Sequence, residues 1–149
     1  IQHTANLVKG ANLLGIPIIV TEQYPKGLGP TVQALSTLLP TPHEKFSFSA
    51  YRSADIRKAI ETTGRSQWVV VGMETHICVY QTARDLRKIG HDVWVPKDAV
   101  ISRTKDNWTT GLDLMSHCGV NIGSTESILF DLLKEGRGDE FKAISRMIR

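Results

Sequence analysis

The side chain best placed to do chemistry in this sequence is Cys78, which follows an apolar run and Gly72 and stands at the start of a predicted helix. At a helix N-terminus, unpaired backbone N–H groups and the positive end of the helix dipole favour a thiolate. The same N–H groups can stabilise the oxyanion that forms when a nucleophile attacks a carbonyl carbon. The turn therefore predicts a nucleophilic cysteine, although free cysteines are also common as small, buried packing residues.

A second cysteine, Cys118, stands just before Gly119 at the end of a predicted helix, where the helix dipole disfavours a thiolate. We therefore expect Cys118 to be structural. The two thiols could form a disulfide, but a reduced, cytoplasmic protein explains them as well. Because the sequence has no Cys-x-x-Cys motif and no His-Glu-x-x-His motif, we expect neither a structural zinc site nor any other cofactor.

Composition places the chain among ordinary globular proteins. Its 149 residues, 41% hydrophobic and 22% charged, are enough for a core and fit one domain over residues 1–149. The net charge of +3 arises from basic and acidic residues that are interspersed, so we expect no nucleic-acid partner. The longest apolar runs are too short to cross a bilayer and no signal peptide is visible, so we expect no membrane partner.

Helix-like and strand-like segments alternate along the chain. Apolar residues recur at helical spacing in six segments: residues 7–14, 54–63, 76–89, 104–117, 126–134 and 140–148. The candidate N-caps are Ser53, Thr104 or Asp106, and Ser124 or Thr125. Four short apolar runs predict buried strands: residues 16–21, 68–71, 92–95 and 119–122. Continuously apolar strands that alternate with helices indicate an α/β fold, a three-layer α-β-α sandwich with a mainly parallel sheet.

Ligands bind at the carboxyl ends of the strands in such folds. Three segments should meet there: residues 22–30, which the Gly and Pro content predicts to be a loop, residues 72–78, and residues 96–103. We expect the chemistry to lie in these segments and in the nearby loop around Lys45.

Several motifs resemble those of one enzyme family. The sequence Gly-Met-Glu-Thr-His-Ile-Cys-Val at residues 72–79 resembles the nucleophile turn of the isochorismatase-like cysteine hydrolases. Residues 45–51, Lys-Phe-Ser-Phe-Ser-Ala-Tyr, resemble the lysine segment of that family. Further similarity to the branch of isochorismatase domain-containing proteins, whose substrate is unassigned, lies at residues 21–25, 27–31, 97–103 and 124–127. The resemblance extends over nearly the whole chain.

In that family an Asp, a Lys and a Cys act together. The resemblance makes Cys78 the nucleophile that attacks a carbonyl or similar electrophilic carbon, and Lys45 the cation beside it. A neighbouring ammonium group stabilises a thiolate on general grounds as well. The resemblance also implies a cis peptide bond between Met73 and Glu74, with the backbone N–H groups of Glu74 and Cys78 as the oxyanion hole.

The catalytic Asp of the family has no counterpart in this sequence. In the family it ends the first strand, which lies ahead of the segment that begins at Ile1 and is central in the sheet. We therefore expect the chain to be incomplete at its N-terminus, with that central strand missing, because its neighbours could not otherwise satisfy their backbone groups. Asp98 follows a different strand, and we interpret it as a structural residue that caps or braces the loop before Ser102.

Four residues near the predicted site are candidates for contact with a small-molecule substrate: Tyr24, Phe46, Tyr51 and His76. Packing is the commoner role of such aromatic residues. His76 is two positions from Cys78, so the two side chains would not face each other on a helix, and a Cys–His dyad is not expected. Nicotinamidase-type members bind a metal between the counterparts of Tyr24 and Lys45. Here that stretch has only His43 and no Asp, so the resemblance implies no metal site.

Two functions remain open at this point. The first is a cysteine-dependent hydrolase of a small amide, imide or related carbonyl compound, acting through a covalent thioester. The second is a non-catalytic binding or assembly module on the same fold. A redox role for Cys78 fits less well, since no resolving cysteine is nearby. The resemblance implies a homo-oligomer, and the apolar face of residues 140–148 could serve an interface or dock on its own domain.

Overall fold

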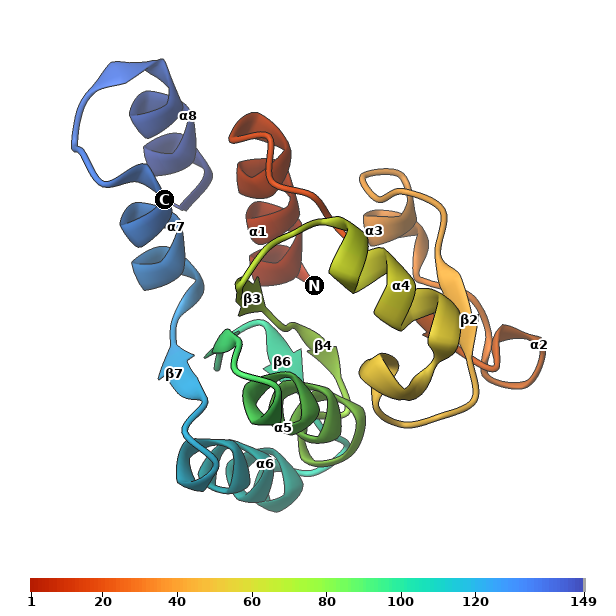
Figure 1. The fold of residues 1–149 in the computed structure, drawn as a ribbon. Helices are drawn as coiled ribbons and strands as arrows, with labels where there is room; N and C mark the ends of the chain where they lie inside the picture. The colour runs from red at the N-terminus through yellow and green to blue at the C-terminus, as the bar shows by residue number, and fades with distance from the viewer. Residues whose placement is uncertain (149) are drawn as a thin grey trace.

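The computed structural model describes residues 1–148, and its paired strands are parallel (Figure 1). The helices are α1 (Gln2–Leu13), α2 (Pro25–Leu28), α3 (Gln33–Ser36), α4 (Ala54–Thr62), α5 (Tyr80–Lys88), α6 (Lys105–His117), α7 (Thr125–Leu133) and α8 (Gly138–Ile148). Two further helical turns are η1 (Ala50–Arg52) and η2 (Thr75–Val79). The strands are β1 (Thr21–Gln23), β2 (His43–Lys45), β3 (Gln67–Val69), β4 (Gly72–Met73), β5 (Asp92–Pro96), β6 (Val100–Ile101) and β7 (Asn121–Gly123). The predicted α/β class with parallel strands is confirmed.

The strands form three separate ladders within residues 1–148. β1 pairs with β2, in a register that places Gln23 opposite Lys45. β3, β5 and β7 form a three-stranded sheet with β5 at its centre. β4, which follows β3 in the chain, pairs with β6, which follows β5. The sheet expected from the sequence is therefore divided, because no strand within the described residues pairs with both β1 and β3.

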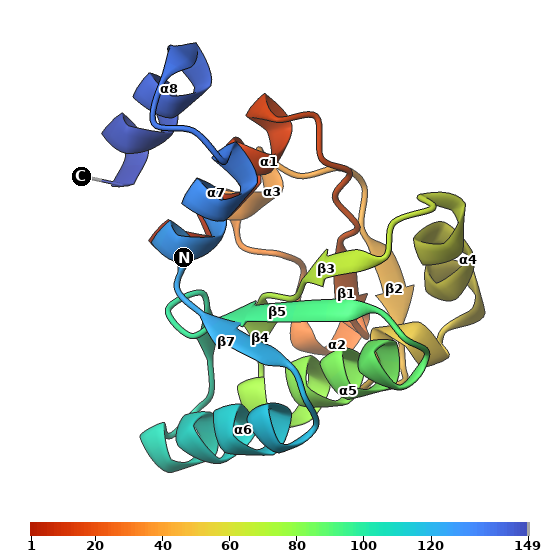
Figure 2. The same cartoon turned by 60° about the vertical axis from the view of Figure 1, so that its left-hand side comes forward.

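Helices cover both faces of β5. Val93 and Val95 are fully buried in one core cluster, together with Leu86 of α5 and Met115 of α6. Trp94, which lies between the two valines, packs against a second cluster to which α1, α7 and α8 contribute. Figure 2 shows α5 and α6 on one side of β5 and β7, with α1, α7 and α8 on the other. Side-chain alternation along one strand therefore divides the interior into two cores.

All four predicted strands have different bounds in the structure, although β5 differs only by extending to Pro96. The strand expected over residues 16–21 begins only at Thr21, because its partner β2 first meets it where His43 N donates to Val20 O, at 2.8 Å. The strand expected over residues 68–71 is divided into β3 and β4, and burial on both faces is wrong for β3, since Val69 is 39% exposed. β7 lies further towards the C-terminus than the predicted residues 119–122.

Two segments expected to be loops contain regular structure. Residues 22–30 include the short helix α2, which begins at Pro25, a residue whose fixed φ suits the first position of a helix. Lys45 is the last residue of β2 rather than part of a loop. β2 has three residues and no alternating pattern of its own, so its existence depends on pairing with β1.

The predicted helix caps have mixed outcomes. Thr104 accepts a hydrogen bond from Asn107 N through its hydroxyl at 3.2 Å, which confirms it as the cap of α6. Ser124 caps α7 through a reciprocal pair of bonds with Ser127. Ser53 is the N-cap residue of α4, as expected, but its side chain makes no capping hydrogen bond.

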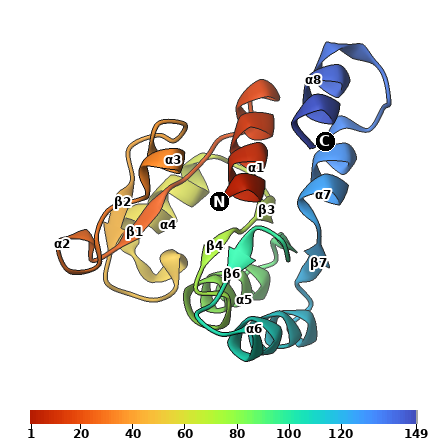
Figure 3. The same cartoon turned by 180° about the vertical axis from the view of Figure 1, so that it is seen from behind.

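The C-terminal helix α8 docks on its own domain (Figure 3). Ile144 is fully buried in the cluster that contains Leu7 and Leu129, and Asn6 Nδ2 donates to Met147 O at 3.0 Å. Of the two roles considered for this apolar face, the structure supports packing within the domain. Within residues 1–148, no helix combines the length and the apolar character needed to cross a membrane.

Candidate active site

Cys78 lies in η2, the helical turn that links β4 to α5. The turn is wider than an α-helix: Val79 N donates to Glu74 O, five residues back, at 3.2 Å. Wide turns of this kind occur often at functional sites. Cys78 is half-buried and is a free thiol, as is Cys118 at the end of α6. The predicted strand–turn–helix arrangement around Cys78 is therefore present, although the helix begins as a wide turn.

The peptide bond between Met73 and Glu74 is cis, as the family resemblance implied. The bond joins the last residue of β4 to the residue that precedes η2. The roles expected for the backbone N–H groups of Glu74 and Cys78 remain predictions.

Helix α6 packs closely against the turn that carries Cys78, at Gly111. A Cβ atom on Gly111 would lie 2.7 Å from the backbone nitrogen of His76 and 2.7 Å from the carbonyl carbon of Thr75. Only a residue without a side chain allows this approach. The sequence signal was a glycine in the interior of a helix, where it costs stability unless something packs against it.

Lys45 is almost fully buried, with 5% of its surface exposed, and its ammonium group is saturated with acceptors. Nζ donates to Oε1 of Gln23, to Ser47 O at 2.9 Å and to Phe48 O at 3.0 Å. Sequence reasoning missed Gln23, because the pairing depends on the register of β1 and β2 rather than on a local pattern.

The structure brings Lys45 and Cys78 together. Burial lowers the pKa of Lys45, because the protein interior disfavours the charged ammonium. The nearby Cys78 side chain opposes part of this decrease in the pKa of Lys45. A buried cation beside a half-buried thiol is an arrangement that can stabilise a thiolate.

The lysine segment is fastened to the helix that follows Cys78. The Thr82 hydroxyl of α5 accepts a hydrogen bond from Ala50 N at 2.9 Å. Arg52 of η1 donates through Nε to Asp85 of α5, also at 2.9 Å. These contacts join segments more than thirty residues apart and hold the loop after Lys45 in place relative to α5.

Asp85 carries its charge in a partly buried place, with 11% of its side chain exposed. Burial alone would raise the pKa of this carboxyl group, but the Ser49 hydroxyl and the guanidinium groups of Arg52 and Arg84 outweigh burial and hold the pKa below its usual value. The carboxylate is therefore the form that supports the folded lysine segment.

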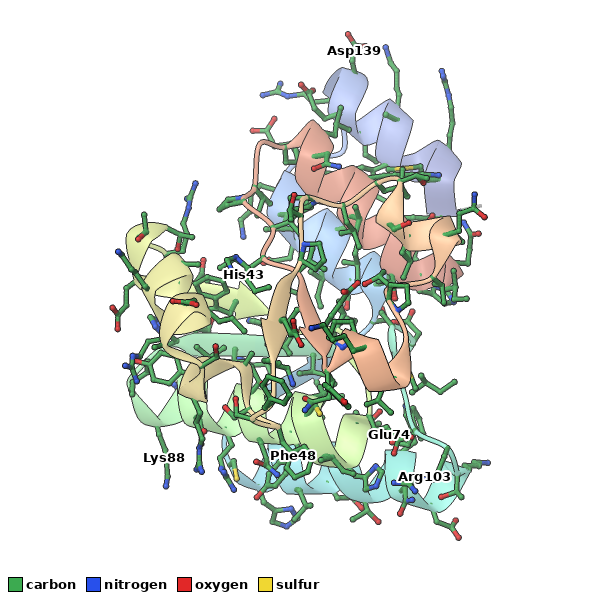
Figure 4. All side chains as sticks on the ribbon, turned by 90° about the vertical axis from the view of Figure 1, so that its right-hand side faces the viewer. His43, Phe48, Glu74, Lys88, Arg103 and Asp139 are labelled. Carbon is green, nitrogen blue, oxygen red and sulfur yellow. The ribbon has the colours of Figure 1, made fainter. Side chains whose placement is uncertain are left out.

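A second polar cluster lies on the other side of the turn. Glu74 accepts from Arg103 N at 3.3 Å and from Arg103 Nε at 3.2 Å, and Figure 4 shows the two side chains next to each other. Nδ1 of His76 lies 3.0 Å from the Ser102 hydroxyl and 3.7 Å from Glu74 Oε2. Sequence analysis placed residues 96–103 near the site, but it assigned no role to Ser102 or Arg103.

The predicted substrate-contacting aromatics differ in their surroundings. Tyr24 and Phe46 are exposed, at 45% and 71%, and their ring centroids lie 5.5 Å apart. Phe48, which Figure 4 labels, is also exposed, at 54%. Tyr51 instead packs against the core cluster of α4 and α5, the packing role that sequence analysis considered commoner.

Asp98 has the structural role predicted for it, although it braces a different element. Its Oδ1 accepts from Thr125 N at 2.8 Å and from the Thr125 hydroxyl at 3.0 Å, at the first residue of α7. His3 of α1 approaches the same carboxylate, at 3.5 Å. The residue therefore ties α1, the loop after β5 and α7 together.

A surface hollow lies apart from the candidate site, and the described residues contain no cluster suited to a metal ion. A surface hollow of about 660 Å³ lies between the ends of α1 and α7 and the start of α8, and none of the predicted site residues lines it. Within residues 1–148, no group of three or more His, Cys, Asp or Glu side chains is arranged to hold a metal ion.

The family model and the most similar curated relatives all indicate the same family. The Isochorismatase domain family matches residues 1–127. Isochorismatase domain-containing protein 2 of Danio rerio is 35% identical over 99% of this chain and 75% of its own length. Isochorismatase domain-containing protein 1 of Salmo salar is 40% identical over 96% of this chain, which spans about half, 51%, of that relative. Among solved structures, the MAR1 ribonuclease of Caenorhabditis elegans superposes with a TM-score of 0.91 at 32% identity, covering 99% of this chain and 77% of that one.

Proposed function

We propose that this chain, which belongs to the isochorismatase domain family, carries the nucleophile of a cysteine-dependent hydrolase that acts on a small amide, imide or related carbonyl compound. The observation that supports this most directly is the buried Lys45 ammonium next to the Cys78 side chain. Burying a cation costs free energy unless the charge interacts with a partner of opposite sign. A Cys78 thiolate is the partner that we propose for Lys45.

The proposed reaction proceeds through a thioester. The Cys78 sulfur attacks the carbonyl carbon, the backbone N–H groups of Glu74 and Cys78 stabilise the oxyanion, and Lys45 stabilises the thiolate. The carbon–nitrogen bond breaks, and the leaving nitrogen takes the proton that the thiol released. Water then attacks the thioester, the carbon–sulfur bond breaks, and a carboxylic acid and the free thiol are formed.

The proposed substrate contacts are Tyr24, Phe46, Tyr51 and His76. Tyr24 and Phe46 support this role best, because their exposed, adjacent rings follow Gln23 and Lys45 directly in the chain. The half-buried His76 lies in the same turn as Cys78 and contacts Ser102. Tyr51 is the weakest of the four, since it packs against the core.

The name of the C. elegans relative raises a second possibility, hydrolysis of RNA. A test is the cleavage of a fluorescent single-stranded RNA by the wild-type protein and by Cys78→Ser. We expect no cleavage by either protein, because the proposed chemistry needs a carbonyl carbon next to the thiolate. Cleavage that Cys78→Ser abolishes would contradict the small-molecule proposal.

The expected homo-oligomer and the cytoplasmic location remain proposals. Exposed apolar side chains near the site, such as Phe46, Phe48 and Met73, support self-association, since such surface is often covered by a partner. Light scattering on the purified chain would measure its mass directly. A monomer at high concentration would contradict the oligomer.

The experiment that tests the main proposal is alkylation by iodoacetamide followed by intact-mass and peptide analysis. We expect Cys78 to react much faster than Cys118 near neutral pH, and Lys45→Met to remove most of the difference. Cys118 serves as a control thiol within the same molecule. Equal, slow alkylation of both cysteines would contradict an activated nucleophile and favour a non-catalytic binding module.

A further inference from the structure

We propose that Gln23 positions Lys45 against Cys78, a role that rests on the proposed function. The two side chains meet because the register of β1 and β2 places Gln23 opposite Lys45. The carboxamide of Gln23 has a contact at each end: Oε1 accepts from Lys45 Nζ, and Nε2 donates to Phe46 O at 2.7 Å. Because an ammonium group can only donate, these two contacts together fix which end of the amide faces the lysine.

Gln23 determines where the Lys45 ammonium group points, because it is the one acceptor among the three that lies outside the lysine segment. An ammonium group has three N–H donors, and Lys45 uses three acceptors. Two of them, Ser47 O and Phe48 O, are backbone carbonyls of the loop that follows Lys45, so they move with it. The third acceptor, Gln23, belongs to the neighbouring strand and therefore ties Nζ to the other side of the site.

The neutrality of these acceptors is equally important. The amide oxygen of Gln23 and the two carbonyl oxygens bind the ammonium group without cancelling its charge. The charge therefore stays available to the Cys78 side chain, which acts on Lys45 electrostatically. A carboxylate in place of the carboxamide would pair with the cation and withdraw it from the thiol.

The test compares Gln23→Glu with Gln33→Glu, a matched control on the exposed surface of α3. The readout is the alkylation rate of Cys78 divided by that of Cys118, which unfolding would change at both thiols. We expect Gln23→Glu to lower this ratio about tenfold, the order of effect of one close charge pair. We expect Gln33→Glu to leave it unchanged. An unchanged ratio in Gln23→Glu would overturn the proposal while the proposed function stands.

A double-mutant cycle shows whether Gln23 acts through the lysine. In a Lys45→Met background, Gln23→Glu should have no further effect on the ratio. The same decrease in both backgrounds would overturn the proposal, since Gln23 would then act on Cys78 directly.

A second readout does not depend on Cys78. Acetylation of Lys45 by an N-hydroxysuccinimide ester, measured relative to the exposed Lys58, should be several-fold faster in Gln23→Leu, because one N–H of the buried ammonium loses its acceptor. An unchanged acetylation rate would overturn the positioning role, even if the thiols proved equally reactive and the proposed function failed.

Discussion

Glu74 and Arg103 are joined by two hydrogen bonds, although 29 residues separate them in sequence. One carboxylate oxygen accepts from the backbone N–H of Arg103 and the other from its guanidinium group. Glu74 directly precedes η2, and Arg103 lies between β6 and α6. Together with the contact between His76 and Ser102, this pair fastens the β6–α6 connection onto the turn that carries Cys78.

Replacing Arg103 should affect reactivity more than stability. Its side chain is 66% exposed, so Arg103→Gln should cost less than about 1 kcal/mol of unfolding free energy. The alkylation rate of Cys78 should nevertheless fall several-fold, because the backbone of the turn loses one of its supports. Arg137→Gln, at an exposed arginine paired with Glu135, is the matched control and should change neither quantity. Equal rates in the two variants would show that the pair does not position the turn.

The sequence predicted the features that depend on neighbours along the chain. An apolar run, Gly72 and a helical pattern are contiguous, so the turn around Cys78 could be located from its local pattern. The same holds for the caps Thr104 and Ser124, whose partners are three residues away. Asp98 was also recognised as a structural residue from its place after a strand, although its bracing of α7 was not predicted.

The features that sequence reasoning missed depend on distant pairing. β2 has only three residues and exists through its ladder with β1, so neither the strand position of Lys45 nor its contact with Gln23 has a local signal. Glu74 finds Arg103 because β4 and β6 are adjacent in space. A prediction of the site from sequence therefore located Cys78 and Lys45, but not the residues that contact Lys45 and the turn around Cys78.

Gly111→Ala should distort the turn that carries Cys78. A Cβ atom at this position would lie within 3 Å of three backbone atoms of η2, which cannot yield as a flexible side chain can. We expect a loss of about 1–3 kcal/mol of unfolding free energy, measured by chemical denaturation, together with a lower alkylation rate of Cys78. Gly136→Ala is the control, since its nearest neighbour is a Phe141 ring atom at 3.9 Å. A neutral Gly111→Ala would mean that α6 does not press on the turn.

Lys45 should make stability depend on alkaline pH. Its pKa in the folded protein lies below 10.5 because of burial, so the unfolded chain binds this proton more tightly. The cost of burying the charge is therefore full below the folded pKa, declines as pH rises through it, and is absent above 10.5. Wild type should gain unfolding free energy relative to Lys45→Met as pH rises through the folded pKa of Lys45 towards 10.5. Lys58→Met, at an exposed lysine, should show no such trend. A constant difference for Lys45→Met would contradict the buried charge.

Asp85 should contribute stability that acid removes. Its pKa in the folded protein lies below 3.8, since Ser49, Arg52 and Arg84 outweigh the effect of burial. The contribution is therefore full above 3.8 and is lost as pH falls through the folded pKa. Asp85→Asn should cost about 1–3 kcal/mol of unfolding free energy at neutral pH and progressively less in acid, as measured by urea denaturation.

The exposed Asp113 of α6 provides the control for Asp85. Asp113→Asn should stay within about 0.5 kcal/mol of wild type at neutral pH. Because Asp85 holds Arg52, and Arg52 follows the lysine segment, Asp85→Asn should also reduce the reactivity of Cys78. A variant that loses stability but keeps the full ratio of Cys78 to Cys118 alkylation would separate the two effects. It would show that the bond between Arg52 and Asp85 is not needed to hold the lysine segment in place.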